Sequence, residues 1–251
     1  MSEPTAPGED GADVALSDVG RRPRLLDLFC CEGGASRGYA DAGFEVVGVD
    51  IEPQRRYPFE FHQADAIAYV REHGREYDAI AASPPCQAYS ITKHSHSAEH
   101  PELIEPTRDA LVASGKPFVM ENVPGAPLLN YVELCGAAFG CEAADTDGTP
   151  LVLRRHRLFE SNVFLIAPPV CACRTYRLRG YSVGGVYGGG SSDRNHAKEV
   201  RRGGYTPGKA VRSELIGADW MTLHGLSQAI PPAYTRWLGG QLLDHLAAVS
   251  A

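Results

Sequence analysis

The sequence predicts an α/β fold with a doubly wound, mostly parallel sheet and a small loop-rich insertion. Apolar runs of strand length alternate with helix-like segments over residues 24–123, which is the pattern of a parallel sheet with crossover helices. A glycine pair, Gly33 and Gly34, closely follows the first apolar run. The chain has 251 residues, 43% of them hydrophobic, and can therefore fill the core of one large domain.

The first elements form a β-turn-α-β unit. Residues 24–29 are expected to form a buried strand, residues 33–36 a turn, residues 37–42 a helix, and residues 45–50 a second strand that ends in an acid. Strands alternating with helices in this way imply right-handed crossovers and parallel pairing.

Later segments continue the alternation and then lose it. Strands are expected over residues 77–82 and 116–123, with a helix over residues 103–113 between them. After Phe164 the pattern gives way to scattered arginines and the glycine-rich stretch 184–190, which indicates loops.

Order returns near the C-terminus. A short helix is expected over residues 213–221, and a terminal helix after Pro232. The terminal helix should pack on the sheet through an apolar stripe formed by Tyr234, Leu238, Leu242, Leu246 and Val249.

Charge is distributed unevenly along the chain, whose net charge is −7. Residues 1–20 hold five acids and no base, whereas residues 151–212 hold 12 Lys or Arg against three acids, a net of +9. A basic segment of this kind is expected for phosphate contacts, and a solvated basic face is an equally weighted alternative. The charge pattern alone therefore allows a nucleic-acid partner in spite of the acidic total, without choosing between these two interpretations.

Composition also bears on the compartment. No apolar run approaches the roughly 20 residues of a membrane helix, and residues 1–22 do not have the pattern of a signal peptide, so we expect no membrane association and a cytoplasmic location. Seven cysteines are an odd number, and Cys30 and Cys31 are adjacent, so we expect reduced thiols.

The loop Ser83–Ser90, with the sequence SPPCQAYS, holds the candidate nucleophile Cys86. Pro84 and Pro85 fix two φ angles and remove two backbone donors, so they stiffen the loop without ladder hydrogen bonds. A lone cysteine is more often a small buried hydrophobe, and that alternative holds unless neighbouring residues supply chemistry.

Acids and small residues at the strand ends indicate a cofactor site, because ligands bind beyond the carboxyl ends of parallel strands. Asp50 ends a strand in the position from which a carboxylate grips ribose hydroxyls, and Asp65 could accept from an adenine amino group or cap a helix.

Four ordered motifs resemble the DNA cytosine 5-methyltransferases, which use S-adenosylmethionine. DLFCCEGG (Asp27–Gly34) is similar to the family's first cofactor motif, and SPPCQAYS to its nucleophile loop. Met120–Val123 is similar to its acidic motif, and Leu153–Arg157 to its arginine motif. The resemblance implies a Rossmann-like methyltransferase fold, S-adenosylmethionine as cofactor and S-adenosylhomocysteine as product. The cofactor-binding residues expected with it are Phe29, Cys30, Gly33, Gly34, Asp50, Ile51, Asp65, Ala66, Pro85 and Thr235.

The same resemblance implies roles for the catalytic residues. Cys86 would add as a thiolate to carbon 6 of cytosine, with its pKa lowered by Arg155 and Arg157. Glu121, kept protonated by a pKa raised on burial, would contact ring nitrogen 3 and the exocyclic amine. Arg157 would hold the cytosine carbonyl oxygen, Arg155 would support the nucleophile and its loop, and Asn122 would brace that loop.

The resemblance also implies a partner. A duplex DNA substrate would need its cytosine flipped out of the stack. We expect contacts to nucleic acid from Gln87, Ser90, Arg174, Arg177 and Arg179. The compact size is similar to small methylases of bacteriophages and their bacterial hosts, which implies a bacterial or phage-infected cytoplasm. We expect a monomer, and restriction, protection and regulation stay open as the biological role.

The chain departs from the family pattern at several positions. Cys31 stands where a glycine is usual, and Leu153 replaces a glutamine. Residues 230–235 occupy the place of a GNS-like turn, where Thr235 is the expected substitute. Residues 166–211 stand where many relatives carry a far longer target-recognition domain, so sequence selectivity should be short or relaxed.

Four cysteines raise the question of a structural zinc, but their spacing lacks the usual C-x2-C knuckle, and we expect no metal at Cys135, Cys141, Cys171 and Cys173. The histidines His94, His96 and His100 are expected on a polar loop beside the active site. That loop could close over a flipped base.

The expected organisation has four parts. Residues 1–22 form a disordered acidic leader, residues 23–165 the cofactor-binding and catalytic domain, residues 166–211 a small basic recognition region, and residues 212–251 C-terminal helices that pack back on the catalytic domain. Two alternatives to DNA methylation stay open. One is an RNA cytosine-5 methyltransferase. The other is a noncatalytic nucleic-acid-binding homologue, although such a homologue should have lost Cys86 or Glu121.

Overall fold

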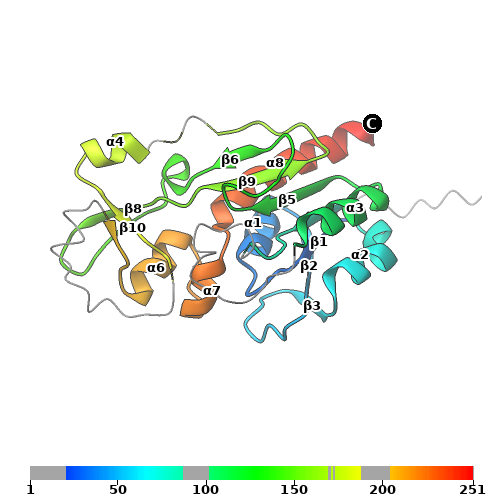
Figure 1. The fold of residues 1–251 in the computed structure, drawn as a ribbon, viewed down its shortest axis with the longest axis horizontal. Coiled ribbons are helices and arrows are strands. Elements are labelled where there is room, and N and C mark those ends of the chain that lie inside the picture. Colours follow the sequence, from blue (N-terminus) through cyan, green and yellow to red (C-terminus); the bar gives the residue numbers. More distant parts are fainter. Residues whose placement is uncertain (1–20, 87–101, 169–170, 172, 188–203, 251) are drawn as a thin grey trace, which may run out of the picture.

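The structure is a computed structural model that describes residues 21–86, 102–168, 171, 173–187 and 204–250. Within these residues the main sheet has seven strands in the order β3-β2-β1-β4-β5-β9-β6 (Figure 1). Their bounds are β1 Arg24–Leu28, β2 Glu45–Asp50, β3 Glu60–Gln63, β4 Ala79–Ala82, β5 Phe118–Asn122, β6 Val132–Leu134 and β9 Arg157–Ser161.

Strands β3, β2, β1, β4 and β5 pair in parallel, whereas β9 pairs antiparallel to both β5 and β6. The expected mostly parallel α/β sheet is therefore confirmed. The alternation of apolar runs did not predict the two antiparallel pairings of β9 at one edge of the sheet.

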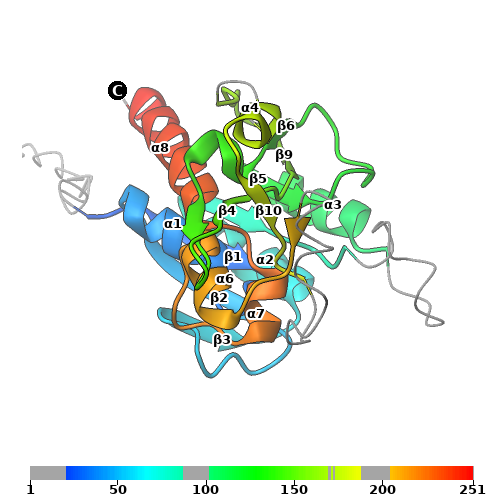
Figure 2. The same cartoon turned by 90° about the vertical axis from the view of Figure 1, so that its left-hand side faces the viewer.

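Helices cover both faces of this sheet. Leu25 on β1 packs with residues of α1 (Gly34–Ala42) and α8 (Pro232–Val249), whereas Leu26 and Leu28 face α2 (Ala66–His73) and α3 (Ile104–Ser114). Alternate residues of a strand point to opposite faces, so both faces of β1 are buried, which explains why its residues after Arg24 are apolar except for the buried Asp27. Figure 2 shows α1 and α8 together on one side of the sheet.

The terminal helix α8 lies against α1 at very close range. Tyr234, Leu238 and Leu242 are fully buried along its stripe. A Cβ atom on Gly38 of α1 would lie 2.0 Å from Thr235 Oγ1, so only glycine permits this approach. The expected packing of the terminal helix on the sheet domain is confirmed, and Val249 at its end is exposed.

Two helix boundaries differ from the expectation. Helix α1 begins at Gly34 and not at residue 37, because Gly33, with φ 84°, already turns the chain into the helix. The helix expected over residues 213–221 lies instead at Lys209–Ile216 (α6) and ends at Gly217, whose φ of 81° is left-handed. A separate short helix, α7 (Leu223–Gln228), follows.

A second sheet of four strands, in the order β11-β10-β8-β7, stands beside the first. Its strands are β7 Glu142–Ala144, β8 Pro150–Leu153, β10 Ser182–Gly184 and β11 Gly204–Tyr205, and α4 (Cys173–Leu178) precedes β10. Strand β10 lies after the expected division at residue 165 and pairs in parallel with β8, which lies before it. The basic region is thus built onto residues 142–153.

The expectations for the N-terminal leader and for membrane helices can be compared with the described residues. The leader expected over residues 1–22 lies outside the described residues, apart from Arg21 and Arg22. Within the residues that the structure describes, every helix is too short or too polar to cross a membrane.

Candidate active site

The candidate site lies at the carboxyl edge of the parallel strands. Strands β1, β2, β4 and β5 share one direction, so their carboxyl ends lie at the same edge. The segments at this edge are the turns after β1 and β2, the end of β5, and the loop after β4 that begins with Ser83, Pro84 and Pro85, called the proline loop below. Residues that are distant in sequence therefore come together without any motif spanning them.

The turn after β1 is held in a left-handed backbone. Phe29, Cys31 and Gly33 have φ angles of 58°, 46° and 84°, and two of these three residues carry side chains. The positive φ of Cys31 gives a physical reason for the glycine that is usual at this position. Cys31 therefore adopts the left-handed conformation of this turn although it carries a side chain.

Asp50 fastens this turn to the end of β2. Its Oδ2 accepts a hydrogen bond from Cys31 N at 2.9 Å, and its Oδ1 accepts from Glu52 N at 3.0 Å. Ile51 is 64% exposed beside it. Asp50 thus shapes the backbone of the candidate cofactor site, a function that the sequence did not predict for it.

A buried polar chain lies beneath the turn. Tyr57 packs its ring over Gly33 and Gly48, and its hydroxyl donates to Ser36 Oγ at 2.8 Å. Ser36 in turn donates to Asp27 Oδ2, while Asp27 Oδ1 has no partner. Burial raises the pKa of Asp27 to about 7. The sequence signal for this network was an aspartate inside an otherwise apolar strand.

Glu32 ties the turn to the C-terminal third of the chain. Its carboxylate accepts from Thr222 N at 2.7 Å and from Thr222 Oγ1 at 2.6 Å, and its carbonyl accepts from Trp220 Nε1 at 2.8 Å. These partners lie about 190 positions away, so sequence reasoning missed the contact. The C-terminal helices are therefore part of the candidate site's framework.

The proline loop is braced from the neighbouring strand, as expected. Asn122 on β5 is fully buried, and its Nδ2 donates to Pro84 O at 2.9 Å. Its Oδ1 accepts from Val123 N at 2.9 Å, which fixes the orientation of the amide. Ser83 N donates to Leu28 O at 3.1 Å. The loop is therefore anchored at Ser83 and Pro84, and Cys86 just beyond them is half-buried.

Glu121 and Arg157 form a buried ion pair beside Cys86. Arg157 Nε lies 2.9 Å from Glu121 Oε1. The Arg157 side chain is 15% exposed and the Glu121 side chain 10%. Burial raises the pKa of Glu121, and the guanidinium of Arg157 opposes that rise only in part. The expected direction of the Glu121 shift is therefore confirmed.

The expected lowering of the Cys86 pKa is wrong for this structure. Burial raises the pKa of the Cys86 thiol, and the Glu121 carboxylate raises it further, which together outweigh the attraction of Arg157. Cys86 and Glu121 thus compete for one negative charge in the same site. A proton on Glu121 would remove the opposing carboxylate and make the Cys86 thiolate easier to form.

The charge of Arg155 lowers the Cys86 pKa, though less than that of Arg157, and its hydrogen bonds go to other parts of the chain. Arg155 is 2% exposed, its Nη1 donates to Val186 O at 3.1 Å, and its Nη2 donates to Ser227 O at 2.6 Å. Tyr234 Oη donates to the Arg155 carbonyl at 2.6 Å. Arg155 therefore holds together the link between β8 and β9, the segment after β10, and helices α7 and α8.

Several expected cofactor residues take structural positions. Asp65 caps α2 by accepting from Ala68 N at 2.8 Å, the alternative weighed from the sequence, and Ala66 is the buried first residue of that helix. Thr235 is buried between α8 and α1, and its Oγ1 donates to Ala35 O at 2.8 Å. Its hydroxyl therefore holds these helices together, and the cofactor contact expected of Thr235 stays a prediction.

The expected nucleic-acid contacts divide into two groups. Arg174, Arg177 and Arg179 are all exposed, on or just after α4, and Arg179 stacks over the rings of Tyr176 and Tyr181 at 5.5 and 5.8 Å. The remaining positions, Gln87, Ser90 and the histidines His94, His96 and His100, lie outside the described residues.

The sheet and its helices have the fold of solved α/β methyltransferases. The structure is similar to that of a Dnmt2 methyltransferase from S. pombe, at 13% identity and a TM-score of 0.58, over 90% of this chain and 99% of that one. It is also similar to an E. coli prophage-encoded protein described as a DNA modification methyltransferase, at 14% identity and a TM-score of 0.53, over 90% and 99% of the two chains. At these identities the likeness shows the fold alone.

Sequence comparison shows what the first half of the chain is similar to. The model of the family described as C-5 cytosine-specific DNA methylase matches residues 24–130. Over 122 residues the chain is 31% identical to the type II methyltransferase M.XorII of Xanthomonas oryzae pv. oryzae. That match covers 41% of this chain and 29% of the relative, so the chain matches less than a third of the relative's length. The resemblance of the motifs to this family is confirmed.

Proposed function

We propose that this protein is a DNA (cytosine-5)-methyltransferase that modifies carbon 5 of a flipped cytosine through a covalent Cys86 adduct at carbon 6. The observation that carries the proposal is the meeting of Cys86 with the buried Glu121–Arg157 pair at one sheet edge. A nucleophile, an acid with raised pKa and a guanidinium are the three groups that activation of a cytosine ring requires.

The charges in the site support an order of events. A protonated Glu121 can donate to ring nitrogen 3 and no longer pairs as an anion with Arg157, whose guanidinium becomes available for the cytosine carbonyl oxygen. The same protonation removes the charge that raises the Cys86 pKa. The thiolate then adds to carbon 6, and electron density moves toward nitrogen 3, where the Glu121 proton neutralises it. One proton on Glu121 thus prepares all three groups.

The residues at the edge fit S-adenosylmethionine, which the family implies. Asp50 presents a carboxylate at the end of β2, and its oxygens keep lone pairs beyond the two backbone bonds. Ile51, 64% exposed, offers an apolar surface against which an adenine can pack. When bound, the cofactor supplies an electrophilic methyl group. The chain's own part is to hold it against the turn after β1 and to orient it toward carbon 5.

After methylation, carbon 5 carries both a methyl group and a proton. A base, which can be water, removes that proton, and the electron pair re-forms the ring double bond as the bond to Cys86 Sγ breaks. Cysteine suits this step because a thiolate is a good leaving group as well as a good nucleophile. The products are 5-methylcytosine, S-adenosylhomocysteine and free Cys86.

The test is incubation with S-adenosylmethionine labelled in its methyl group and with either duplex DNA or tRNA, followed by nucleoside analysis. The expected result is label in 5-methyldeoxycytidine, with Cys86→Ala inactive and Cys141→Ser, a cysteine outside the site, active. Label in 5-methylcytidine alone would instead assign the RNA alternative. Label in neither nucleoside would contradict the enzyme and favour a noncatalytic nucleic-acid-binding protein.

A further inference from the structure

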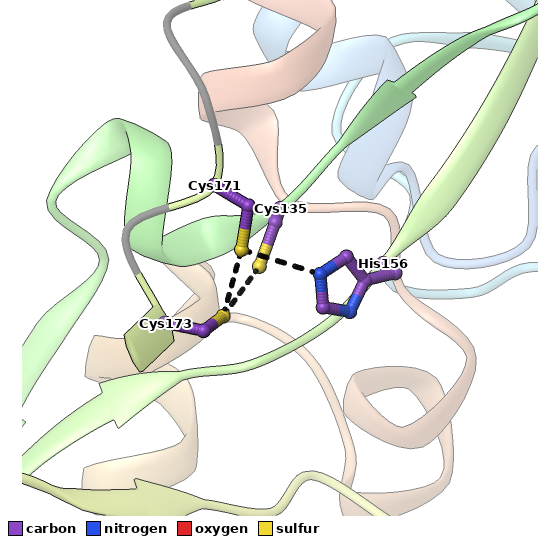
Figure 3. A group of neighbouring side chains, drawn as sticks. All are labelled: Cys135, His156, Cys171 and Cys173. Carbon is purple, nitrogen blue, oxygen red and sulfur yellow. Dashed lines mark hydrogen bonds between the residues drawn. The ribbon is translucent and has the colours of Figure 1, made fainter. Parts of the chain in front are cut away.

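Three cysteines and one histidine meet at a place that the methylation chemistry does not use. Their ligand atoms, from Cys135, His156, Cys171 and Cys173, all lie within 4.8 Å of one another (Figure 3). Cys173 Sγ lies 3.3 Å from Cys135 Sγ and 3.0 Å from Cys171 Sγ, and His156 Nε2 lies 3.4 Å from Cys171 Sγ. Four potential ligands from three parts of the chain therefore face a common point.

The ligand types and spacings are those of a tetrahedral metal centre. Zinc binds thiolates at about 2.3 Å and imidazoles at about 2.0–2.1 Å, which places ligand atoms of a tetrahedron roughly 3.6–3.8 Å apart. The contacts of 3.0–3.4 Å lie just below this spacing, and the limit of 4.8 Å lies about 1 Å above it. Small side-chain adjustments would therefore complete the geometry.

The set also argues against a simple disulfide. Cys173 lies near both Cys135 and Cys171. A disulfide from Cys173 to either of them would leave the third thiol and the imidazole of His156 without a shared partner. All of the cysteines in the described chain are free thiols. The carboxylate of Glu133, 3.6 Å from His156 Nε2, adds negative charge at the rim, which favours a cation.

We propose that Cys135, His156, Cys171 and Cys173 form a structural zinc site. With four protein ligands the coordination is closed, which is the mark of a structural and not a catalytic zinc. The sequence expectation of no metal rested on the spacing of four cysteines, one of which, Cys141, packs instead against the apolar cluster around Leu215. The structure puts His156 in its place.

The zinc site would join the recognition region to the catalytic sheet. Cys135 directly follows β6, His156 lies between Arg155 and Arg157 ahead of β9, and Cys173 begins α4. A metal at this point fixes the start of α4, with its exposed arginines, relative to the strand that presents Arg157 to Glu121. This would let a short recognition region hold its position without a large core of its own.

The test is metal analysis of the full chain purified under reducing conditions without chelator. We expect about one zinc per chain in the wild type and in Cys141→Ser, the matched cysteine control, and loss of most of that zinc in Cys173→Ser. Because Cys173→Ser could fail to fold, a second measurement uses the wild type alone. Replacement of the zinc by Co²⁺ should give the intense visible bands of a tetrahedral site together with thiolate-to-metal charge transfer.

Three outcomes would overturn the proposal. The first is a wild-type protein that contains no stoichiometric zinc and takes up no Co²⁺. The second is a disulfide-linked peptide containing Cys173 as the main species in the freshly purified protein. The third is equal loss of zinc from Cys141→Ser and Cys173→Ser. None of these measurements depends on methyl transfer, so they test the metal site separately from the enzyme activity.

Discussion

Replacement of Asp27 by asparagine should stabilise the protein increasingly, relative to wild type, as the pH rises toward about 7, because Asp27 is a fully buried acid on the central strand β1. Its pKa is raised from 3.8 to about 7, with burial as the largest cause. Between these two values the unfolded chain releases the proton and the folded chain keeps it. Asp27 therefore contributes stability below pH 3.8 that is lost as the pH rises through about 7.

The magnitude follows from the width of this window. Each pH unit inside it costs about 1.4 kcal/mol, so between about pH 5 and about pH 7 the wild type should lose roughly 3 kcal/mol through Asp27. The asparagine side chain would resemble the protonated acid and still accept the hydrogen bond from Ser36. The free energy of unfolding of Asp27→Asn relative to wild type should therefore rise by about 3 kcal/mol across this range.

The assay is urea unfolding of both proteins at a series of pH values, with midpoints converted to free energies at a common slope. Using the difference between the two proteins cancels the titration of the other acids. A difference that stays constant with pH, or that falls as the pH rises, would refute the account of Asp27 as a buried acid with a raised pKa.

Three further predictions concern the site. Asn122→Ala should cost about 1–3 kcal/mol of stability, because it leaves the buried Pro84 carbonyl unpaired, and it should slow the reactions of Cys86. Thermal unfolding measures the first effect and the alkylation rate of Cys86 the second. Unchanged values would contradict a role of Asn122 in holding the loop. Glu121→Gln removes the carboxylate that raises the Cys86 pKa, so the pH profile of iodoacetamide labelling at Cys86 should move to lower pH, and a move to higher pH would contradict it. Neutralising substitutions of the exposed Arg174, Arg177 and Arg179 should weaken DNA binding and reduce its dependence on salt concentration. An unchanged salt dependence would show that these arginines are only solvated.

The parallel sheet and its edge could be predicted from the sequence, because they depend on local patterns. Uninterrupted apolar runs mark strands buried on both faces, and parallel strands bring their carboxyl ends to one edge whatever their order. The meeting of Cys86, Asn122 and Glu121 in one site is implied by the resemblance of their motifs to those of the cytosine 5-methyltransferases. The bracing of Pro84 by Asn122 follows from neighbouring strands in that sheet.

Contacts that depend on distant packing could not be predicted. The bonds of Glu32 to Thr222 and of Arg155 to Ser227 join segments that no local pattern relates. The sign of the Cys86 pKa shift depends on how burial and the Glu121 carboxylate compare with Arg157, which spacing does not reveal. Likewise, the placing of His156 among three cysteines follows from the pairing of β9 with β6.

The central claim is that Cys86 forms a covalent bond to cytosine, and trapping on duplex DNA that contains 5-fluorocytosine tests it most directly. Fluorine at carbon 5 replaces the proton that must leave, so the adduct should persist after methyl transfer. We predict a denaturant-stable complex for the wild type and for Cys141→Ser, mapped by peptide analysis to Cys86, and none for Cys86→Ala. A complex that persists in Cys86→Ala would contradict the account by showing that another residue is the nucleophile.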